Sequence, residues 1–442
     1  MSVCPYYSSY GGKLFRISSN QSSIEIRSQY DATPFSNSIW EKDLLVHATA
    51  ISSHEELPLG AEAKEWNLYS RYGIEINKNR QIPNGANVAV LDTGIFEHFE
   101  FRENLLPGHD FISSNALSFD GDGRDNDFGP ESGRFGDCQQ VGNDILAHGT
   151  HVTGVISSSG KSEFSNVGVS PRSSILPIRV LGACGGSIID VLEGMLWASG
   201  ESVGGVPDNN DKISVVNLSL GGLGKCPESF QSVINQLNKK NIITVVAAGN
   251  SSMNLNTSDF FPANCSGVIA VGATNVNGQI PAYSNYGDDL VYAPGGDSQR
   301  GVLSTFVEQG NTLEGTYGEM MGTSMSAPHI SGLVAIVKSE FPDLNVETVK
   351  DILKKSINSY GIVSYEKLEE TIHNENFQII KNKEVHSLEM DNNKNEKNKE
   401  IIGCGTIDSN FGGGSGGMQA VLYSLLAGVL IILLIESTRA DA

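Results

Sequence analysis

Six short apolar segments, each rich in β-branched residues and bounded by glycine-containing turns, constrain the fold of this chain most. They cover residues 87–91, 174–181, 213–220, 242–248, 268–272 and 290–293. Runs of four to eight such residues are typical of strands that are buried on both faces. Helical patterns lie between them at 151–157, 188–199 and 230–239, and one more follows at 345–357. This alternation predicts an α/β fold, a doubly wound parallel sheet with helices on both faces.

The 442 residues are enough for one large α/β domain with appendages. We expect that domain at 61–372. Residues 1–60 are irregular, and we interpret them as the remains of a propeptide, although they are short and lack a clear ferredoxin-like pattern. The charged tract at 391–400 has nothing to bury, which predicts a polar linker at 373–411. A Gly-rich tail then occupies 412–442.

The overall charge limits the class of partner. The formal net charge is −21 and the pI is near 4.8. Phosphate binding needs a cationic face, so this balance argues against nucleic acid. The first twenty residues lack the basic stretch and apolar core of a signal peptide, so export requires either a start upstream or another route.

Three motifs place a reactive side chain where a buried element meets a glycine-rich turn. Asp92 follows a strand in VAVLDTG, His148 opens a helix in AHGTHVTG, and Ser324 precedes a helix in GTSMSAPH. A serine hydroxyl needs a base to remove its proton, and the base needs a carboxylate to fix its tautomer. Together, in this order, the three predict nucleophilic catalysis.

The motifs VLDTGI, HGTHVTG and GTSMSAPH resemble those of the subtilisin family, from about residue 65 to about residue 341. The resemblance implies that Asp92 orients His148, that His148 is the general base, and that Ser324 is the nucleophile. It also implies that Asn250, in VVAAGNSS, donates to the oxyanion; the alternative is a turn residue at a strand end. His151 lies three residues from His148, lacks an apparent third metal ligand, and is structural in the family.

The family resemblance also implies a peptide-binding cleft. Ser219, Leu220 and Gly221 would bind an extended peptide by main-chain pairing, while Ala247, Ala248 and Gly249 would form the opposite wall of the specificity pocket. Small residues there predict room for a sizeable side chain. The pocket floor falls within 251–261, and the cleavage preference stays open.

Two further features resemble a secreted bacterial subgroup. Its cysteines make a disulfide between Cys184 and Cys226 plausible; the alternative is two unpaired thiols. Its acidic loop resembles the segment here with Asp120, Asp122, Asp125 and Asp127, whose oxygen ligands suit structural Ca²⁺. A solvated acidic turn is the alternative.

The tail carries an apolar segment at 418–435, long enough at about 27 Å to cross a membrane. A buried core helix is the alternative. With the preceding GGGSGG it resembles the Gly-Gly sorting signal that a rhomboid-type protease (rhombosortase) cuts in Gram-negative bacteria. Only Arg439 follows, where several arginines are usual, so a permanent anchor or a removed GPI-type tail also fits.

We therefore predict a serine endopeptidase that acts on proteins or peptides through an acyl-enzyme. It would be secreted or held at the cell envelope by its tail before any processing. The alternatives are a catalytically silent peptide-binding homologue and a surface calcium-binding protein.

Overall fold

The protein is represented by a computed structural model. It describes residues 4–10, 13–19, 39–49, 51–52, 65–77, 80–118, 120–121, 123–130, 147–161, 167–182, 184–307 and 315–374. The predicted linker and tail therefore lie outside the described residues, apart from the first two residues of the linker. No helix within the described ranges is long and apolar enough to span a membrane. The segment at 418–435 is not among them, so its membrane role stays a prediction.

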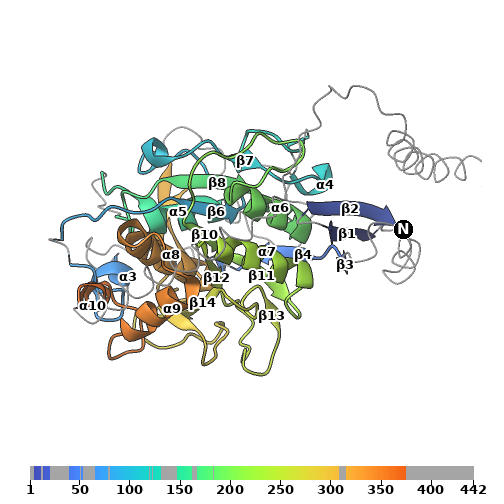
Figure 1. Cartoon of the computed structure of the whole chain (residues 1–442). Helices are drawn as coiled ribbons and strands as arrows, with labels where there is room; N and C mark the ends of the chain where they lie inside the picture. The colour runs from blue at the N-terminus through green and yellow to red at the C-terminus, as the bar shows by residue number, and fades with distance from the viewer. Residues whose placement is uncertain are drawn as a thin grey trace, which may run out of the picture. The chain divides into compact units, whose positions relative to one another are not determined.

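A seven-stranded parallel sheet forms the centre of the fold, in the order β15-β14-β12-β10-β6-β8-β7 (Figure 1). Every neighbouring pair in it is parallel. Its strands are β6 (Val88–Asp92), β7 (His109–Asp110), β8 (Ile175–Arg179), β10 (Val215–Leu218), β12 (Ile243–Ala247), β14 (Ile269–Thr274) and β15 (Val291–Pro294). The predicted fold class is confirmed.

Helices cover both faces of this sheet. α5 (His148–Ser157) and α8 (Thr323–Glu340) pack on one face, and α6 (Ile188–Ala198) and α7 (Glu228–Lys239) pack on the other. The remaining helices are α3 (Trp66–Tyr69), α4 (Asn115–Ser118), α9 (Val346–Lys355) and α10 (Tyr365–Ile372), with a 3₁₀ turn, η1, at Arg102–Asn104. The predicted helical segments all lie within or overlap these elements.

The strands bury side chains alternately on the two faces. In β6, Val88 and Val90 belong to the core that includes residues of α5 and α8. Ala89 and Leu91 belong to the other core, with residues of α6 and α7. Because successive side chains in a strand point to opposite faces, a continuous apolar run fills both cores at once.

The apolar run at 213–220 was predicted to be one strand, but the structure divides it between two. β10 ends at Leu218, and Leu220 begins β11 (Leu220–Leu223), which belongs to a four-stranded sheet in the order β13-β11-β4-β9. The other members are β4 (Leu45–Ala48), β9 (Gly186–Ser187) and β13 (Phe260–Phe261). The chain thus leaves the central sheet at Ser219, so β11 begins directly beyond the carboxyl end of β10.

The N-terminal region contains strands that the sequence analysis did not predict. β1 (Cys4–Tyr10), β2 (Lys13–Ser19) and β3 (Ile39–Lys42) form an antiparallel sheet. β5 (Ile51–Ser52) pairs with β17 (Thr316–Met321), which in turn pairs with β16 (Val302–Phe306). Residues 45–48 and 51–52 are therefore paired with strands of the α/β domain through β4 and β5.

The predicted disulfide between Cys184 and Cys226 is wrong. Cys226 is bonded to Cys265, with their Cα atoms 5.1 Å apart, and Cys184 is itself in a disulfide. The reason is the position of β4 between β9 and β11. Two strand spacings, about 10 Å, separate those strands, which is beyond the reach of a disulfide. Cys265 instead follows β13, the direct neighbour of β11.

Removing this disulfide is expected to weaken the fold. The bond joins residues 39 positions apart, and closing such a loop restricts the unfolded chain by about 4 kcal/mol in the chain-entropy account. A Cys226→Ser, Cys265→Ser double variant should lose free energy of unfolding on that scale in denaturant titrations. An unchanged titration midpoint would contradict this contribution.

Candidate active site

The site forms where the strand order of the central sheet changes direction. From β6 the chain proceeds outward to β7 and β8, then returns to β10 on the other side of β6. The crevice beyond the carboxyl ends of β6 and β10 is the usual place for a ligand in such sheets. Asp92 ends β6, and Ser219 directly follows β10.

Asp92 and His148 form a buried hydrogen bond at this edge. Nδ1 of His148 lies 2.6 Å from Oδ1 of Asp92, and both side chains are fully buried. The backbone N–H of Thr93 donates to the same oxygen at 2.7 Å. A carboxylate only accepts, so Nδ1 carries the proton and Nε2 is left as an acceptor. Nε2 is buried and has no hydrogen-bond partner among the described residues.

Gly149 allows the start of α5 and the end of β6 to approach each other this closely. A Cβ built on Gly149 would lie 2.3 Å from the carbonyl oxygen of Gly94 and 3.1 Å from Cβ of Asp92. The N–H of Gly149 also donates to Oγ1 of Thr93 at 3.1 Å. The start of α5 can therefore reach the end of β6 only because residue 149 has no side chain.

Ser324 occupies the second position of α8, and Ser219 holds it there. Pro328 lies four residues further along α8 and lacks the N–H that would bond the Ser324 carbonyl. The hydroxyl of Ser219 donates to that carbonyl instead, at 2.9 Å. Oγ of Ser324 donates to the Ser219 carbonyl, also at 2.9 Å. This reciprocal pair joins the start of α8 to the end of β10.

Asn250 directs its amide N–H₂ into the same space. Its Oδ1 accepts from the backbone N–H and the hydroxyl of Thr323, at 3.0 and 2.9 Å. These bonds fix which way the amide faces. Its Nδ2 donates to the carbonyl oxygen of Thr49 at 2.5 Å, and the backbone N–H of Ser324 donates to that oxygen at 3.2 Å. Two donors therefore converge on one carbonyl beside a serine hydroxyl.

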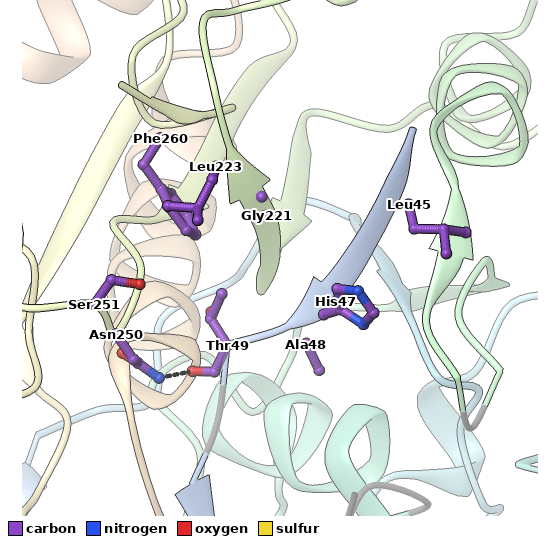
Figure 2. Close-up of a pocket in the computed structure, with 10 residues that line it drawn as sticks. Leu45, His47, Ala48, Thr49, Gly221, Leu223, Asn250, Ser251 and Phe260 are labelled. Carbon is purple, nitrogen blue, oxygen red and sulfur yellow. Dashed lines mark hydrogen bonds between the residues drawn. The ribbon is translucent and has the colours of Figure 1, made fainter. Parts of the chain in front are cut away.

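The chain's own residues 45–49 lie in the cleft as an extended peptide (Figure 2). β4 pairs antiparallel with β11, with Ala48 opposite Leu220 and His47 opposite Gly221. The N–H of Thr49 donates to the Ser219 carbonyl at 3.2 Å, and Oγ1 of Thr49 lies 2.7 Å from Oγ of Ser324. β5 then pairs with β17 on the far side. The described residues on either side of residue 50 are thus both held by strand pairing.

Only some of the residues expected to bind substrate meet the peptide-like segment β4. Ser219, Leu220 and Gly221 meet β4 through their main chain. Ala247 and Ala248 lie fully buried in the two hydrophobic cores and do not line the pocket beside Thr49. Gly249 has its backbone N–H bonded to Oγ1 of Thr323 at 3.0 Å.

His151 is placed away from the reacting groups. Its Nε2 lies 2.9 Å from the carbonyl oxygen of Val302. Burial lowers the pKa of His151 to about 3, so it stays neutral near neutral pH. The geometry fits the structural role implied by the resemblance.

The acidic loop is held by protein donors where the structure describes it. Oδ2 of Asp120 lies 2.6 Å from Nη1 of Arg179. Burial acts to raise the pKa of Asp120, but the hydrogen bonds from Ser118 and Arg179 outweigh it and hold that pKa below its usual range. Asp125 and Asp127 accept backbone N–H groups of their own loop, at 2.7 and 2.9 Å.

Within the described ranges no three His, Cys, Asp or Glu side chains form a group suited to a metal ion. The described carboxylates of this loop therefore do not make a Ca²⁺ ligand set by themselves. Asp122 lies outside the described residues, so calcium binding stays a prediction.

The chain belongs to the subtilase family, whose model matches residues 83–405. Over 288 residues it is 38% identical to the "Extracellular basic protease" of Dichelobacter nodosus, an alignment that covers 62% of this chain and 47% of that protein. It is 37% identical over 328 residues to the "Extracellular protease" of Xanthomonas campestris, covering 72% and 54%. The chain thus spans about half the length of these two relatives.

A solved structure has the same fold. A protease from Pseudoalteromonas arctica superimposes with a TM-score of 0.61 at 35% identity, covering 69% of this chain and 96% of that one. The carboxylate, imidazole and hydroxyl described above therefore lie within a fold that a related protease shares.

Sequence reasoning missed three contributors to the site. Thr49 lies in a segment without any motif, and only its pairing with β11 reveals it. Thr323 precedes the serine within GTSMS and orients Asn250. Phe260 lies in the range 251–261 that was expected to hold the pocket floor, and it lines the pocket beside Thr49.

Proposed function

We propose that this chain is a serine endopeptidase whose reacting groups are Asp92, His148 and Ser324. The observation that carries the proposal is the Thr49 carbonyl. Its oxygen accepts from Asn250 Nδ2 and from the Ser324 N–H, while Ser324 Oγ lies beside the same residue. A peptide carbonyl held in this way is positioned for attack by the serine.

The reaction proceeds by transfer of one proton through His148. Ser324 Oγ turns from the Ser219 carbonyl, gives its proton to His148 Nε2 and bonds to the substrate carbonyl carbon. Asp92 stabilises the imidazolium through Nδ1–H. Collapse of the tetrahedral intermediate breaks the C–N bond, and His148 returns the proton to the leaving amine. Water then hydrolyses the acyl-enzyme by the same route.

The oxyanion is stabilised by Asn250 Nδ2 and the Ser324 N–H, at the start of α8, where the helix dipole also favours negative charge. Asn250→Ala should lower kcat by a factor of about 10² to 10³, the size known from the corresponding group of subtilisin, with little change in KM. Steady-state kinetics on a peptide substrate measure this. Ser251→Ala, at the neighbouring pocket position, is the matched control. A loss of less than tenfold in Asn250→Ala would exclude this role.

The same geometry makes the bond between Thr49 and Ala50 the chain's first substrate. After its cleavage, residues 1–49 form a segment whose last five residues still fill the cleft. This segment is most of the range 1–60 that was interpreted as the remains of a propeptide. Hydrolysis of other proteins then requires that this segment dissociate or be degraded.

Incubation of the purified full chain tests the proposal. Mass spectrometry should detect residues 1–49 and a chain that begins at Ala50, at a rate independent of protein concentration. Hydrolysis of casein should appear afterwards. A folded chain that neither cleaves itself nor hydrolyses casein would instead favour a catalytically silent peptide-binding homologue.

We also propose that the chain is exported and held briefly by its tail. The relatives from D. nodosus and X. campestris are named as extracellular. Residues 412–442 carry the glycine-rich stretch and the apolar segment 418–435, which would hold the chain in a membrane until a rhombosortase-type protease cuts it. Finding the intact tail in the medium would contradict this.

The proposed calcium site is tested by chelation. If the acidic loop binds Ca²⁺ with Asp122 among its ligands, EDTA should lower the melting temperature of the full chain and added Ca²⁺ should restore it. Asp122→Asn should remove this dependence. An unchanged melting temperature would leave a solvated acidic turn.

A further inference from the structure

Phe260 reaches into the specificity pocket from β13. It lies opposite Leu223 in the antiparallel pairing of β13 with β11. Neighbouring residues in a strand face opposite ways, and Phe261 accordingly enters the hydrophobic core shared with α6 and α7. Phe260 is 5% exposed and lines the pocket that also contacts Thr49 and Asn250 (Figure 2).

The ring packs closely against the main chain of both Gly221 and Gly249. A Cβ built on Gly221 would lie 2.5 Å from Cε1 of Phe260. One built on Gly249 would lie 2.6 Å from the same atom and 2.7 Å from Cζ. Both distances are far below van der Waals contact. The two glycines therefore accommodate the aromatic ring, which reverses the expectation that their small size leaves room for a large substrate side chain.

The side chain that the molecule itself presents at this position is small. Thr49 is 7% exposed. Thr49 lines this pocket, and its carbonyl is fixed by Asn250 and Ser324, which holds the residue beside the pocket.

We propose that Phe260 determines the specificity of this enzyme by restricting the residue before the cleaved bond to small side chains such as alanine, serine and threonine. A phenylalanine or leucine there collides with the ring, which is fixed from both sides by Gly221 and Gly249 and by the pairing of β13. A clash that rejects the wrong side chain is one of the two general ways to achieve specificity. The inference rests on the proposed peptidase function and names its substrate class.

A set of quenched fluorescent peptides tests it on the processed enzyme. The peptides keep the sequence around the bond after Thr49 and differ only in that residue, which is Ala, Thr, Leu or Phe. We expect kcat/KM for the Ala and Thr peptides to exceed that for the Phe peptide by about 100-fold or more. Phe260→Gly should raise kcat/KM for the Phe peptide by a similar factor, and Phe260→Leu should fall between. Ile280→Ala, an exposed apolar residue that is not among those lining this pocket, is the control that leaves the preference unchanged.

Self-cleavage offers a second test within the intact chain. Thr49→Phe should slow it, and adding Phe260→Gly to that variant should restore it. Equal cleavage of all four peptides by the wild type would overturn the inference, as would a folded and active Phe260→Gly enzyme with an unchanged preference. Failure to cleave any peptide would instead contradict the peptidase function itself.

Discussion

A chain with Ser324 replaced by alanine is expected to fold and yet neither cleave itself after Thr49 nor hydrolyse peptides at a measurable rate. The loss in kcat should be about 10⁶, the size found for the nucleophile of subtilisin. The physical reason is that the Ser324 hydroxyl lies beside the residue whose carbonyl is held by Asn250 Nδ2 and the Ser324 N–H. Ser324 Oγ lies 2.7 Å from Oγ1 of Thr49, whose own carbonyl accepts from Asn250.

Ser326→Ala is the matched control for this variant. Ser326 lies two residues further along α8 and is equally buried. Its side-chain hydroxyl has no hydrogen-bond partner among the described residues. Its replacement should leave self-cleavage and kcat within a few fold. Electrophoresis of both purified chains over time, with circular dichroism as a check on folding, provides the comparison. Self-cleavage by a folded Ser324→Ala chain would show that another group is the nucleophile.

Asp92→Asn should lower kcat by about 10⁴ while leaving KM nearly unchanged. Oδ1 of Asp92 accepts from both His148 Nδ1–H and the Thr93 N–H. An amide carries no charge to stabilise the imidazolium. The amide can also turn its N–H₂ group toward Nδ1 of His148. Nδ1 then accepts a hydrogen bond and the ring proton lies on Nε2, which can no longer take the proton of Ser324.

The Asp92→Asn variant needs a separate check because both side chains are fully buried. Its melting temperature and its kcat should be measured on the same preparation. A folded variant with kcat within a factor of ten of the wild type would contradict the orienting role. Asp208→Asn, at an exposed position outside the site, serves as a charge-matched control.

The sequence predicted the central sheet and its reactive edge well, because both depend on local patterns. β6 is a short apolar run that ends at Asp92, and its alternate residues fill two cores, as parallel strands require. The motifs around Asp92 and His148, which place glycine beside the reactive residue at the end of a strand or the start of a helix, also have a local cause. Residue 149, for example, must be glycine because a side chain there would prevent His148 from approaching Asp92.

The rest depended on contacts between distant parts of the chain. Thr49 carries no local signal, and it enters the site only because β4 pairs with residues some 170 positions away. The pairing of β11 with β13 likewise lies beyond the reach of local patterns, and it places Cys226 near Cys265, to which it is bonded in place of Cys184. Phe260 could be placed only once the pairing of β13 with β11 was known.

Labelling with a fluorophosphonate probe, followed by peptide mapping, tests the central claim most directly. The probe should be applied to the processed chain after residues 1–49 are removed, because residues 45–49 fill the cleft before that. We predict one covalent adduct, on the peptide that contains Ser324, retained in Ser326→Ala and absent from Ser324→Ala. A folded, processed chain that gives no adduct, or an adduct at another residue, would contradict the account.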